Sequence, residues 1–304
     1  MTALVIGEAL VDIVRRPDGS VVEYAGGSPA NVSIALARLG RDTTLATSLA
    51  HDRLGDLVRT TLAASGVRLR PMRSAERTSS AMATIGDDGA ASYVFDLSWD
   101  IDLPKPDEQP LVVHTGSIGA VLDPGGVAVL ALLEELRAGS TVTYDLNVRP
   151  AVMRPRDELV KQVEALVGAA DVVKASDEDL EYLYPGSTSV DAAANLLSLG
   201  PAAVLVTTGG GGAVAVLQSR TVSVAARPAT VADTIGAGDT FMAGTIDALW
   251  ALGLLGADTR EALRSATDDT WRAVLDHAAA AAAVTVSRPG ADPPWRAELP
   301  ALVP

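Results

Sequence analysis

The segment DTIGAGDTFMAG, at 233–244, combines small residues with a carboxylate in a pattern that could support phosphoryl transfer. Asp239 directly follows Gly236, Ala237 and Gly238, where an apolar, helix-like stretch begins. Small residues before a helix let consecutive backbone N–H groups converge on an anion, and the helix dipole adds to the attraction. A carboxylate there could accept a proton from an attacking hydroxyl while the N–H groups stabilise the phosphoryl group. The alternative is an ordinary acidic helix start.

Polar residues also follow the first predicted strand. Glu8 and Asp12 come just after an apolar run, where carboxylates could accept hydrogen bonds from vicinal hydroxyls or simply face solvent. The segment AGGSPANVS, at 25–33, places two glycines before a predicted helix with Asn31 in its first turn and Ser28 as the expected N-cap. This arrangement suits a polyhydroxylated ligand, or a glycine turn that leads into an ordinary helix.

A third polar group ends a strand predicted at 140–148. Asp145, Asn147 and Arg149 alternate along the chain, which predicts that all three project to one face of the strand. A buried polar face without partners would be costly, so this face is expected to contact a ligand or a polar network.

Two later segments carry weaker signals. Lys174 lies within an apolar strand, and the acidic cluster after it, which includes Asp179, could bind Mg²⁺ through water or start a helix. The run TTGGGGA, at 207–213, could approach a nucleotide or simply turn the chain. The sequence contains no GxxxxGK[ST] segment and no full GxGxxG after the first strand, which excludes a P-loop and argues against a dinucleotide fingerprint.

Composition limits the classes of protein that the chain can belong to. Its 304 residues are 48% hydrophobic and 20% charged, which indicates a folded globular protein. The formal net charge of -14 is the wrong sign for a general binder of nucleic acid or anionic membranes. There is no cysteine, which excludes disulfides and thiolate catalysis, and neither a signal peptide nor a membrane span is expected. We therefore expect a cytoplasmic protein with small-molecule ligands.

Strand-like and helix-like segments alternate along most of the chain. This alternation predicts an α/β protein with a parallel sheet covered by helices on both faces. Strands are expected at 3–7, 43–50, 111–117, 140–148, 171–176 and 203–210, with helices between them and after the last. Two long helices are expected near the end, at about 239–255 and 268–283.

Two excursions interrupt this alternation. Strand-like segments within about 13–27 and 79–100 read as hairpins, the second with GDDGA as its turn. Together they could form a small sheet that covers the carboxyl ends of the main strands as a lid, or they could be decorative. No long linker or repeat is present, so we expect a single domain, 1–304, with a lid.

Two of these segments together resemble the paired signatures of the PfkB (ribokinase-like) carbohydrate kinase family. They are AGGSPANVSIALARLG near the start and DTIGAGDTFMAG near the end, in the family's order and separation. The flanking segments GEALVD, HTGSIGAVLDPG, DLNVRP, VVKASDEDLEYL and SRPGADP resemble the bacterial fructokinase branch, which is close to the 2-keto-3-deoxygluconate kinases. The resemblance implies a Rossmann-like, three-layer core with a mainly parallel central sheet, a small β-sheet lid, and transfer of phosphate from MgATP to a sugar hydroxyl.

The resemblance also implies roles for particular residues. Asp239 would be the general base, and the N–H groups of Gly236, Ala237 and Gly238 would form the anion hole. The implied sugar-binding residues are Asp12, Gly27, Asn31 and Arg149. The implied nucleotide-binding residues are Lys174, Thr207, Gly209 and Gly212, with His277 near the adenine. The implied cation-binding residues are Asp233 and the carbonyl of Ile235 for a monovalent ion such as K⁺, and Asp179 for Mg²⁺ through water.

The chain departs from the family pattern in its lid. The segment ASYVFDLSWD carries Asp96 and Trp99 where the resemblance predicts an aromatic residue with an arginine. A fructokinase is the expected activity, with a 2-keto-3-deoxygluconate kinase as the alternative and a ribokinase or nucleoside kinase less favoured. A non-catalytic sugar or nucleotide sensor on the same fold is the alternative from another class, although the base and its glycines are intact. The exposed edge of a lid would allow a homodimer.

Overall fold

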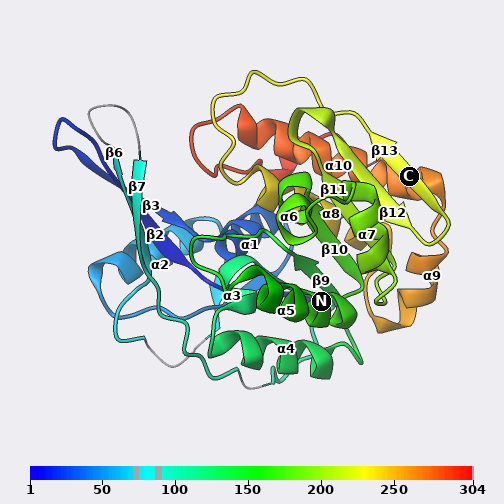
Figure 1. The fold of residues 1–304 in the computed structure, drawn as a ribbon, viewed down its shortest axis with the longest axis horizontal. Coiled ribbons are helices and arrows are strands. Elements are labelled where there is room, and N and C mark those ends of the chain that lie inside the picture. Colours follow the sequence, from blue (N-terminus) through cyan, green and yellow to red (C-terminus); the bar gives the residue numbers. More distant parts are fainter. Residues whose placement is uncertain (71–74, 86–90, 104, 303–304) are drawn as a thin grey trace.

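The computed structural model of the chain describes residues 1–70, 75–85, 91–103 and 105–302. Its largest element is a nine-stranded sheet in the order β13-β12-β11-β10-β9-β8-β1-β4-β5 (Figure 1). These strands are β1 (Ala3–Ile6), β4 (Thr43–Ala46), β5 (Arg68–Leu69), β8 (Val112–Gly116), β9 (Thr141–Asp145), β10 (Val172–Ser176), β11 (Ala203–Thr207), β12 (Ala213–Leu217) and β13 (Arg220–Val224). All neighbours pair in parallel except β11 with β12 and β12 with β13, so the predicted, mainly parallel sheet is confirmed.

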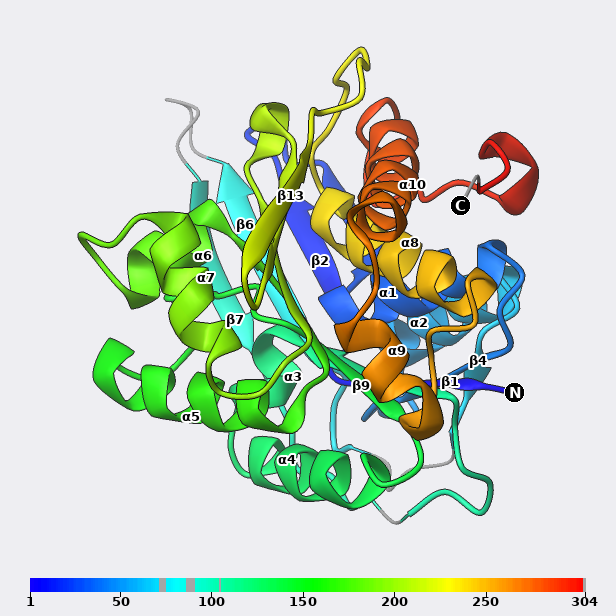
Figure 2. The ribbon, with the colours of Figure 1, turned by 90° about the vertical axis from the view of Figure 1, so that its right-hand side faces the viewer.

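Helices cover both faces of this sheet and make a three-layer core (Figure 2). One layer contains α1 (Ser28–Arg38), α2 (Arg53–Ala64), α8 (Ala237–Ala251), α9 (Arg260–Arg264) and α10 (Asp268–Val286). The opposite layer contains α3 (Ser117–Val121), α4 (Gly125–Leu136), α5 (Arg156–Ala169), α6 (Asp177–Leu183) and α7 (Ser189–Leu197). Short 3₁₀ turns lie at Gly209–Gly211, Ala257–Thr259 and Arg296–Glu298.

The central strands are apolar on both faces because both faces are buried. Val5 and Leu205 pack in the core on the α8 side, whereas Ile6 and Val204 pack in the core on the α4 side. This explains why the strands read as continuous apolar runs in the sequence. The helix predicted after β11 is wrong: the chain turns back as β12, which is mostly buried, and β13, which is mostly exposed and forms one edge of the sheet.

A second sheet projects from one side of the core (Figure 1). Its order is β3-β2-β6-β7, from strands β2 (Leu10–Arg15), β3 (Val21–Gly26), β6 (Ser80–Ile85) and β7 (Ala91–Asp96). Strand β2 begins before the predicted limit of 13, because it continues almost directly from β1 into the second sheet. The predicted turn at 86–90 lies outside the described residues. We call this second sheet the lid.

None of the described helices is both long enough and apolar enough to cross a membrane.

Candidate functional site

The carboxylate of Asp239 lies where the first turn of α8 meets the start of α1. The Ser28 hydroxyl donates to Oδ1 of Asp239 at 2.6 Å, and Nδ2 of Asn31 donates to Oδ2 at 2.8 Å. Asp239 is only 7% exposed, so these two hydrogen bonds define the orientation of its carboxylate. Ser28 was expected to cap α1, but Gly27 is the N-cap and the Ser28 side chain contacts Asp239 instead. The sequence therefore missed Ser28 as a site residue.

The turn before Asp239 has the conformation of an anion-binding helix start. Gly236 is the N-cap of α8 with φ of 75°, a left-handed conformation that favours glycine. The backbone continues into the first helical turn, where the N–H of Ala237 donates to the backbone oxygen of Thr234 at 3.3 Å. The N–H groups of Gly238 and Asp239 in the same turn have no partner further back in the helix. A Cβ on Gly238 would lie 2.9 Å from Nζ of Lys174, so a lysine ammonium stands directly beside this turn.

Lys174 forms a buried ion pair with Asp145. Its Nζ lies 3.0 Å and 2.9 Å from the two carboxylate oxygens of Asp145, and both residues are almost fully buried. Burial lowers the pKa of Lys174, but the charges of Asp145, Asp179 and Asp239 outweigh it and raise the pKa above its ordinary value. A positive charge is thus held at the start of α8.

A cleft of about 500 Å³ opens beside this helix start, and we call it the α8 cleft. Thr207, Gly209 and Gly212 line it together with Ala237 and Gly238, so the structure brings three predicted nucleotide-binding residues to the predicted anion hole. Further lining residues come from the segment after β13, from α8 and from α10: Ala226, Arg227, Pro228, Ala229, Val231, Thr234, Phe241, Ala279, Ala282, Ala283 and Val286. The sequence analysis missed this mostly apolar wall, which suits a flat aromatic ring.

His277 does not line the α8 cleft. It is 4% exposed on α10, and its Nε2 lies 2.7 Å from Oδ2 of Asp247. Arg41 and Arg296 also bind Asp247, so His277 belongs to a buried ionic network between α8, α10 and the C-terminal segment. His277 is thus not among the residues that line the α8 cleft, and its place near an adenine stays a prediction.

On the other side of Asp239, the lid meets the start of α1. Asp12 lies on β2, and its carboxylate packs directly against Gly26. A Cβ added to Gly26 would lie 2.2 Å from Oδ2 of Asp12. Burial raises the pKa of Asp12, although the positive charge of Arg149 opposes the rise, so Asp12 and Arg149 are electrostatic neighbours. Gly27 has φ of 102°, and a Cβ there would lie 2.6 Å from the backbone oxygen of Glu8. Among the predicted sugar-binding residues, Asn31 contacts Asp239 directly and Asp12 is an electrostatic neighbour of Arg149.

The alternation predicted for Asp145, Asn147 and Arg149 is wrong. Strand β9 ends at Asp145, and Asn147 has φ of 40°, which breaks the extended conformation that alternation requires. Asp145 is buried against Lys174, whereas Arg149 is exposed and its Nη1 donates to the backbone oxygen of Val148 at 3.0 Å.

The carboxylate of Asp179 is used by the backbone. Its Oδ1 accepts from the N–H of Val148 at 2.7 Å, and its Oδ2 accepts from the N–H of Ser176 at 2.8 Å in a capping box at the start of α6. This geometry favours the helix-start interpretation of the acidic cluster. Within the described residues, no three His, Cys, Asp or Glu side chains are arranged to hold a metal ion.

Asp233 connects the loop before α8 to the segment after α10. Its two oxygens accept from the N–H groups of Ile235, at 3.0 Å, and Gly290, at 2.9 Å. These backbone donors lower the pKa of Asp233, which keeps it ionised. The predicted cation loop is thus an ordered turn that carries a negative charge at neutral pH.

The two unusual lid-proximal residues have structural partners. Trp99 is 4% exposed and its Nε1 donates to the backbone oxygen of Gly119 at 2.7 Å. Asp96 is exposed at the end of β7 and pairs with Nε of Arg77 at 2.8 Å.

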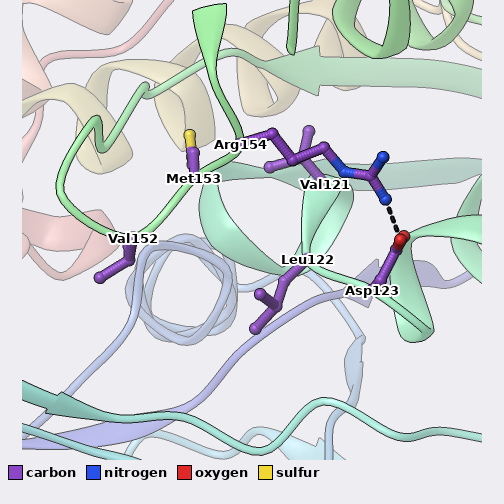
Figure 3. Close-up of a pocket in the computed structure, with 6 residues that line it drawn as sticks. All are labelled: Val121, Leu122, Asp123, Val152, Met153 and Arg154. Carbon is purple, nitrogen blue, oxygen red and sulfur yellow. Dashed lines mark hydrogen bonds and ion pairs between the residues drawn. The ribbon is translucent and has the colours of Figure 1, made fainter. Parts of the chain in front are cut away.

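A second pocket, of about 400 Å³, lies between the end of α3 and the segment before α5 (Figure 3). Its apolar lining is Val121, Leu122, Val152 and Met153, and an ion pair between Asp123 and Arg154 closes one side. None of the predicted site residues lines this second pocket.

Comparisons with known proteins identify the family of the chain. A family model described as pfkB family carbohydrate kinase matches residues 2–298. The fructokinase of Rhizobium leguminosarum bv. trifolii is 33% identical over 257 residues, which cover 81% of this chain and 79% of that protein. The structure of fructokinase with bound ATP from Xylella fastidiosa is 25% identical with a TM-score of 0.83, covering 98% of this chain and 95% of that one. The aminoimidazole riboside kinase of Salmonella enterica, complexed with aminoimidazole riboside and an ATP analog, is 26% identical with a TM-score of 0.77, covering 96% and 95%.

Proposed function

Because the chain belongs to the pfkB family of carbohydrate kinases, we propose that it transfers the γ-phosphoryl group of MgATP to a hydroxyl of fructose. The observation that carries this proposal is the position of Asp239. Its carboxylate accepts hydrogen bonds from Ser28 and Asn31 at the start of α1, and it directly follows Gly238, which lines the α8 cleft. Relatives named fructokinase that are 33% and 32% identical to this chain support the choice of fructose as the sugar.

In the proposed reaction, Asp239 accepts the proton of the attacking hydroxyl. Ser28 and Asn31 hold its carboxylate by hydrogen bonds, so the base does not need to reorient during the reaction. The N–H groups of the first turn of α8 and the ammonium of Lys174 stabilise negative charge on the transferred group. MgATP, when bound in the α8 cleft, supplies that group. Thr207, Gly209 and Gly212 would lie along the nucleotide, and the apolar wall of α10 would contact its base.

The sugar would bind on the lid side of Asp239. Asp12 and Asn31 offer a carboxylate and an amide for hydroxyl groups, and Gly27 lets the sugar approach the backbone closely. Arg149 adds a guanidinium at the edge of the same region. Closure of the lid over the sugar would exclude water from the reaction.

Asp233 and the carbonyl of Ile235 would bind a monovalent cation next to the anion hole. The support is the ionised carboxylate of Asp233, which lies in the short segment just before Gly236, the N-cap of α8. Magnesium would enter with ATP, with Asp179 contributing at most through water. Replacing K⁺ by a bulky cation such as tetramethylammonium should lower the rate if the monovalent site is correct.

The exposed edges of the lid support a homodimer. Tyr24 on the edge strand β3 is 51% exposed, and Val94 on the other edge strand, β7, is 65% exposed. Exposed apolar side chains on sheet edges favour association with a second copy. Sedimentation should then show a dimer that Tyr24→Glu weakens, whereas a monomeric wild type at all concentrations would contradict it.

The test of the function is release of ADP from MgATP against a panel of acceptors. The panel contains fructose, 2-keto-3-deoxygluconate, ribose, adenosine, aminoimidazole riboside and a sample without acceptor. Turnover that depends on fructose supports the proposal. Turnover with another member keeps the kinase and replaces fructose, and no turnover with any acceptor would count against catalysis and favour a sensor.

A further inference from the structure

Glu8 is a buried carboxylate that the proposed reaction does not use. It follows β1 directly and is only 5% exposed. Its Oε2 accepts from the N–H of Gly119 at 2.7 Å, and the Ser117 side chain also donates to the carboxylate. Both donors belong to the start of α3, so the side chain of Glu8 joins the end of β1 to this short helix.

Three segments meet at Glu8 without room for further atoms. A Cβ on Gly27 would lie 2.6 Å from the backbone oxygen of Glu8, and a Cβ on Gly119 would lie 2.7 Å from its nitrogen. Gly27 belongs to the proposed sugar region, and Gly119 belongs to α3. The backbone of Glu8 is therefore in close contact with the N-cap of α1 and with the start of α3, and the Glu8 side chain holds α3 there through its hydrogen bonds.

The start of α3 depends on outside support. Ser117 has φ of 54°, a left-handed conformation that a residue with a side chain keeps only when neighbouring groups hold it. Glu8 accepts hydrogen bonds on both sides of this strained turn, from Ser117 itself and from Gly119. Loss of these bonds would allow the turn to relax.

Glu8 is also electrostatically coupled to the proposed base. Burial raises the pKa of Glu8 to about 7, the hydrogen bonds from Gly119 and Ser117 oppose the rise, and the charge of Asp239 adds to it. The groups that face Glu8 are thus Ser117 and Gly119 from α3, Gly27 from the start of α1, and Asp239 from α8.

We propose that Glu8 is a positioning residue of the sugar site, which fixes the start of α3 opposite Gly27 and so sets the width of the site next to Asp239. This inference rests on the proposed function, because the sugar site is defined by it. It predicts that Glu8 matters for the sugar and much less for ATP, since the α8 cleft lies on the other side of Asp239.

The test compares Glu8→Ala and Glu8→Gln with matched changes at Asp171. Asp171 is another fully buried carboxylate that accepts from a backbone N–H, that of Val142 at 2.9 Å, and it also pairs with Arg260. It lies at the amino end of β10, whereas Glu8 lies beyond the carboxyl end of β1. Steady-state kinetics would measure kcat and the KM values for sugar and ATP from pH 6 to 9. Thermal unfolding would measure stability.

Glu8→Ala should raise the KM for the sugar by about tenfold or more and change the KM for ATP by less than about threefold. Glu8→Gln keeps an acceptor oxygen for Gly119, so it should restore most of the sugar affinity while removing the pH dependence near 7. Asp171→Ala should lower the melting temperature without moving either KM.

Several results would overturn the inference. Equal changes in both KM values for Glu8→Ala, or an unchanged KM for the sugar, would show that Glu8 has no specific role at the sugar site. If Glu8→Ala does not fold, Glu8→Gln takes its place in the test, with Asp171→Asn as its control. A pH profile of the sugar KM that is the same for Glu8→Gln, Asp171→Asn and the wild type would also overturn the inference. A wild type without turnover on any acceptor would instead overturn the proposed function, and this inference with it.

Discussion

Replacement of Gly236 by alanine tests whether the start of α8 has to keep its present position. Gly236 has φ of 75°, and a Cβ there would lie 2.7 Å from Cβ of Ala291. Gly253 supplies a matched control just beyond the other end of the same helix, because its φ is 69° and a Cβ there would meet nothing within 4 Å. Both substitutions impose a left-handed conformation on alanine, but only Gly236→Ala also introduces a steric overlap.

The expected magnitudes follow from these geometries. A left-handed alanine costs about 1 kcal/mol at either position. Overpacking adds about 1–3 kcal/mol at Gly236 only. Two methyl carbons in contact stand about 3.8 Å apart, so the overlap requires the start of α8 or Ala291 to move by about 1 Å. A displacement of that size next to the reacting groups costs roughly 10² in rate.

The assay combines thermal unfolding with steady-state turnover of the preferred sugar. Gly253→Ala should lower the melting temperature by about 2 °C and leave kcat within about twofold of wild type. Gly236→Ala should lower the melting temperature by about 4–8 °C and kcat by roughly 10². Turnover of Gly236→Ala at or near the wild-type rate would refute the assignment of this turn as the anion hole.

Two further predictions concern buried carboxylates. The pKa of Glu8 is raised from 4.5 to about 7, so the folded protein binds a proton there that the unfolded chain releases, and stability falls as pH rises between these values. Urea unfolding should therefore show that the free energy of unfolding of Glu8→Gln, relative to that of wild type, increases by up to about 3 kcal/mol from pH 5 to pH 8. A difference between the two proteins that does not change with pH would contradict the raised pKa of Glu8. Asp247 accepts hydrogen bonds from Arg41 at 2.6 Å and His277 at 2.7 Å and pairs with Arg296, so Asp247→Ala should cost about 3–5 kcal/mol in the same assay. The kcat of Asp247→Ala, measured well below the melting temperature, should stay within about threefold of wild type, because the ionic network around Asp247 lies outside the α8 cleft. A large loss of kcat without destabilisation would contradict this structural role.

Local sequence patterns predicted much of the fold and the helix start at Asp239. The apolar runs of strands and the start signals of helices depend on residues that are close together in the sequence. This is why the parallel sheet and α8 could be predicted. The break at Asn147 was not, because a single positive φ in a non-glycine residue leaves no periodic signal. Strands β12 and β13 were missed because their apolar runs do not reveal on which side of β11 the chain returns.

The partners of the site residues were less accessible to sequence reasoning. The Ser28 hydroxyl and Asp239 are separated by 211 positions, and only packing of α1 against α8 brings them together. His277 is a second example, because its buried partner Asp247 lies on another helix, 30 positions away in the chain, and the sequence did not indicate this contact. The resemblance to a family supplied roles for residues, but the orientation of each side chain comes from tertiary contacts.

The proposed reaction depends most directly on Asp239 as the proton acceptor, and the substitution Asp239→Asn tests this role. Asparagine keeps the size of the side chain and an oxygen that can accept from Ser28, so the sugar and ATP should still bind. The measurement is kcat for the preferred sugar together with both KM values. If Asp239 is the general base, Asp239→Asn should lower kcat by a factor of about 10² or more and leave both KM values within a few-fold of wild type. A variant that retains kcat close to the wild-type value would contradict it.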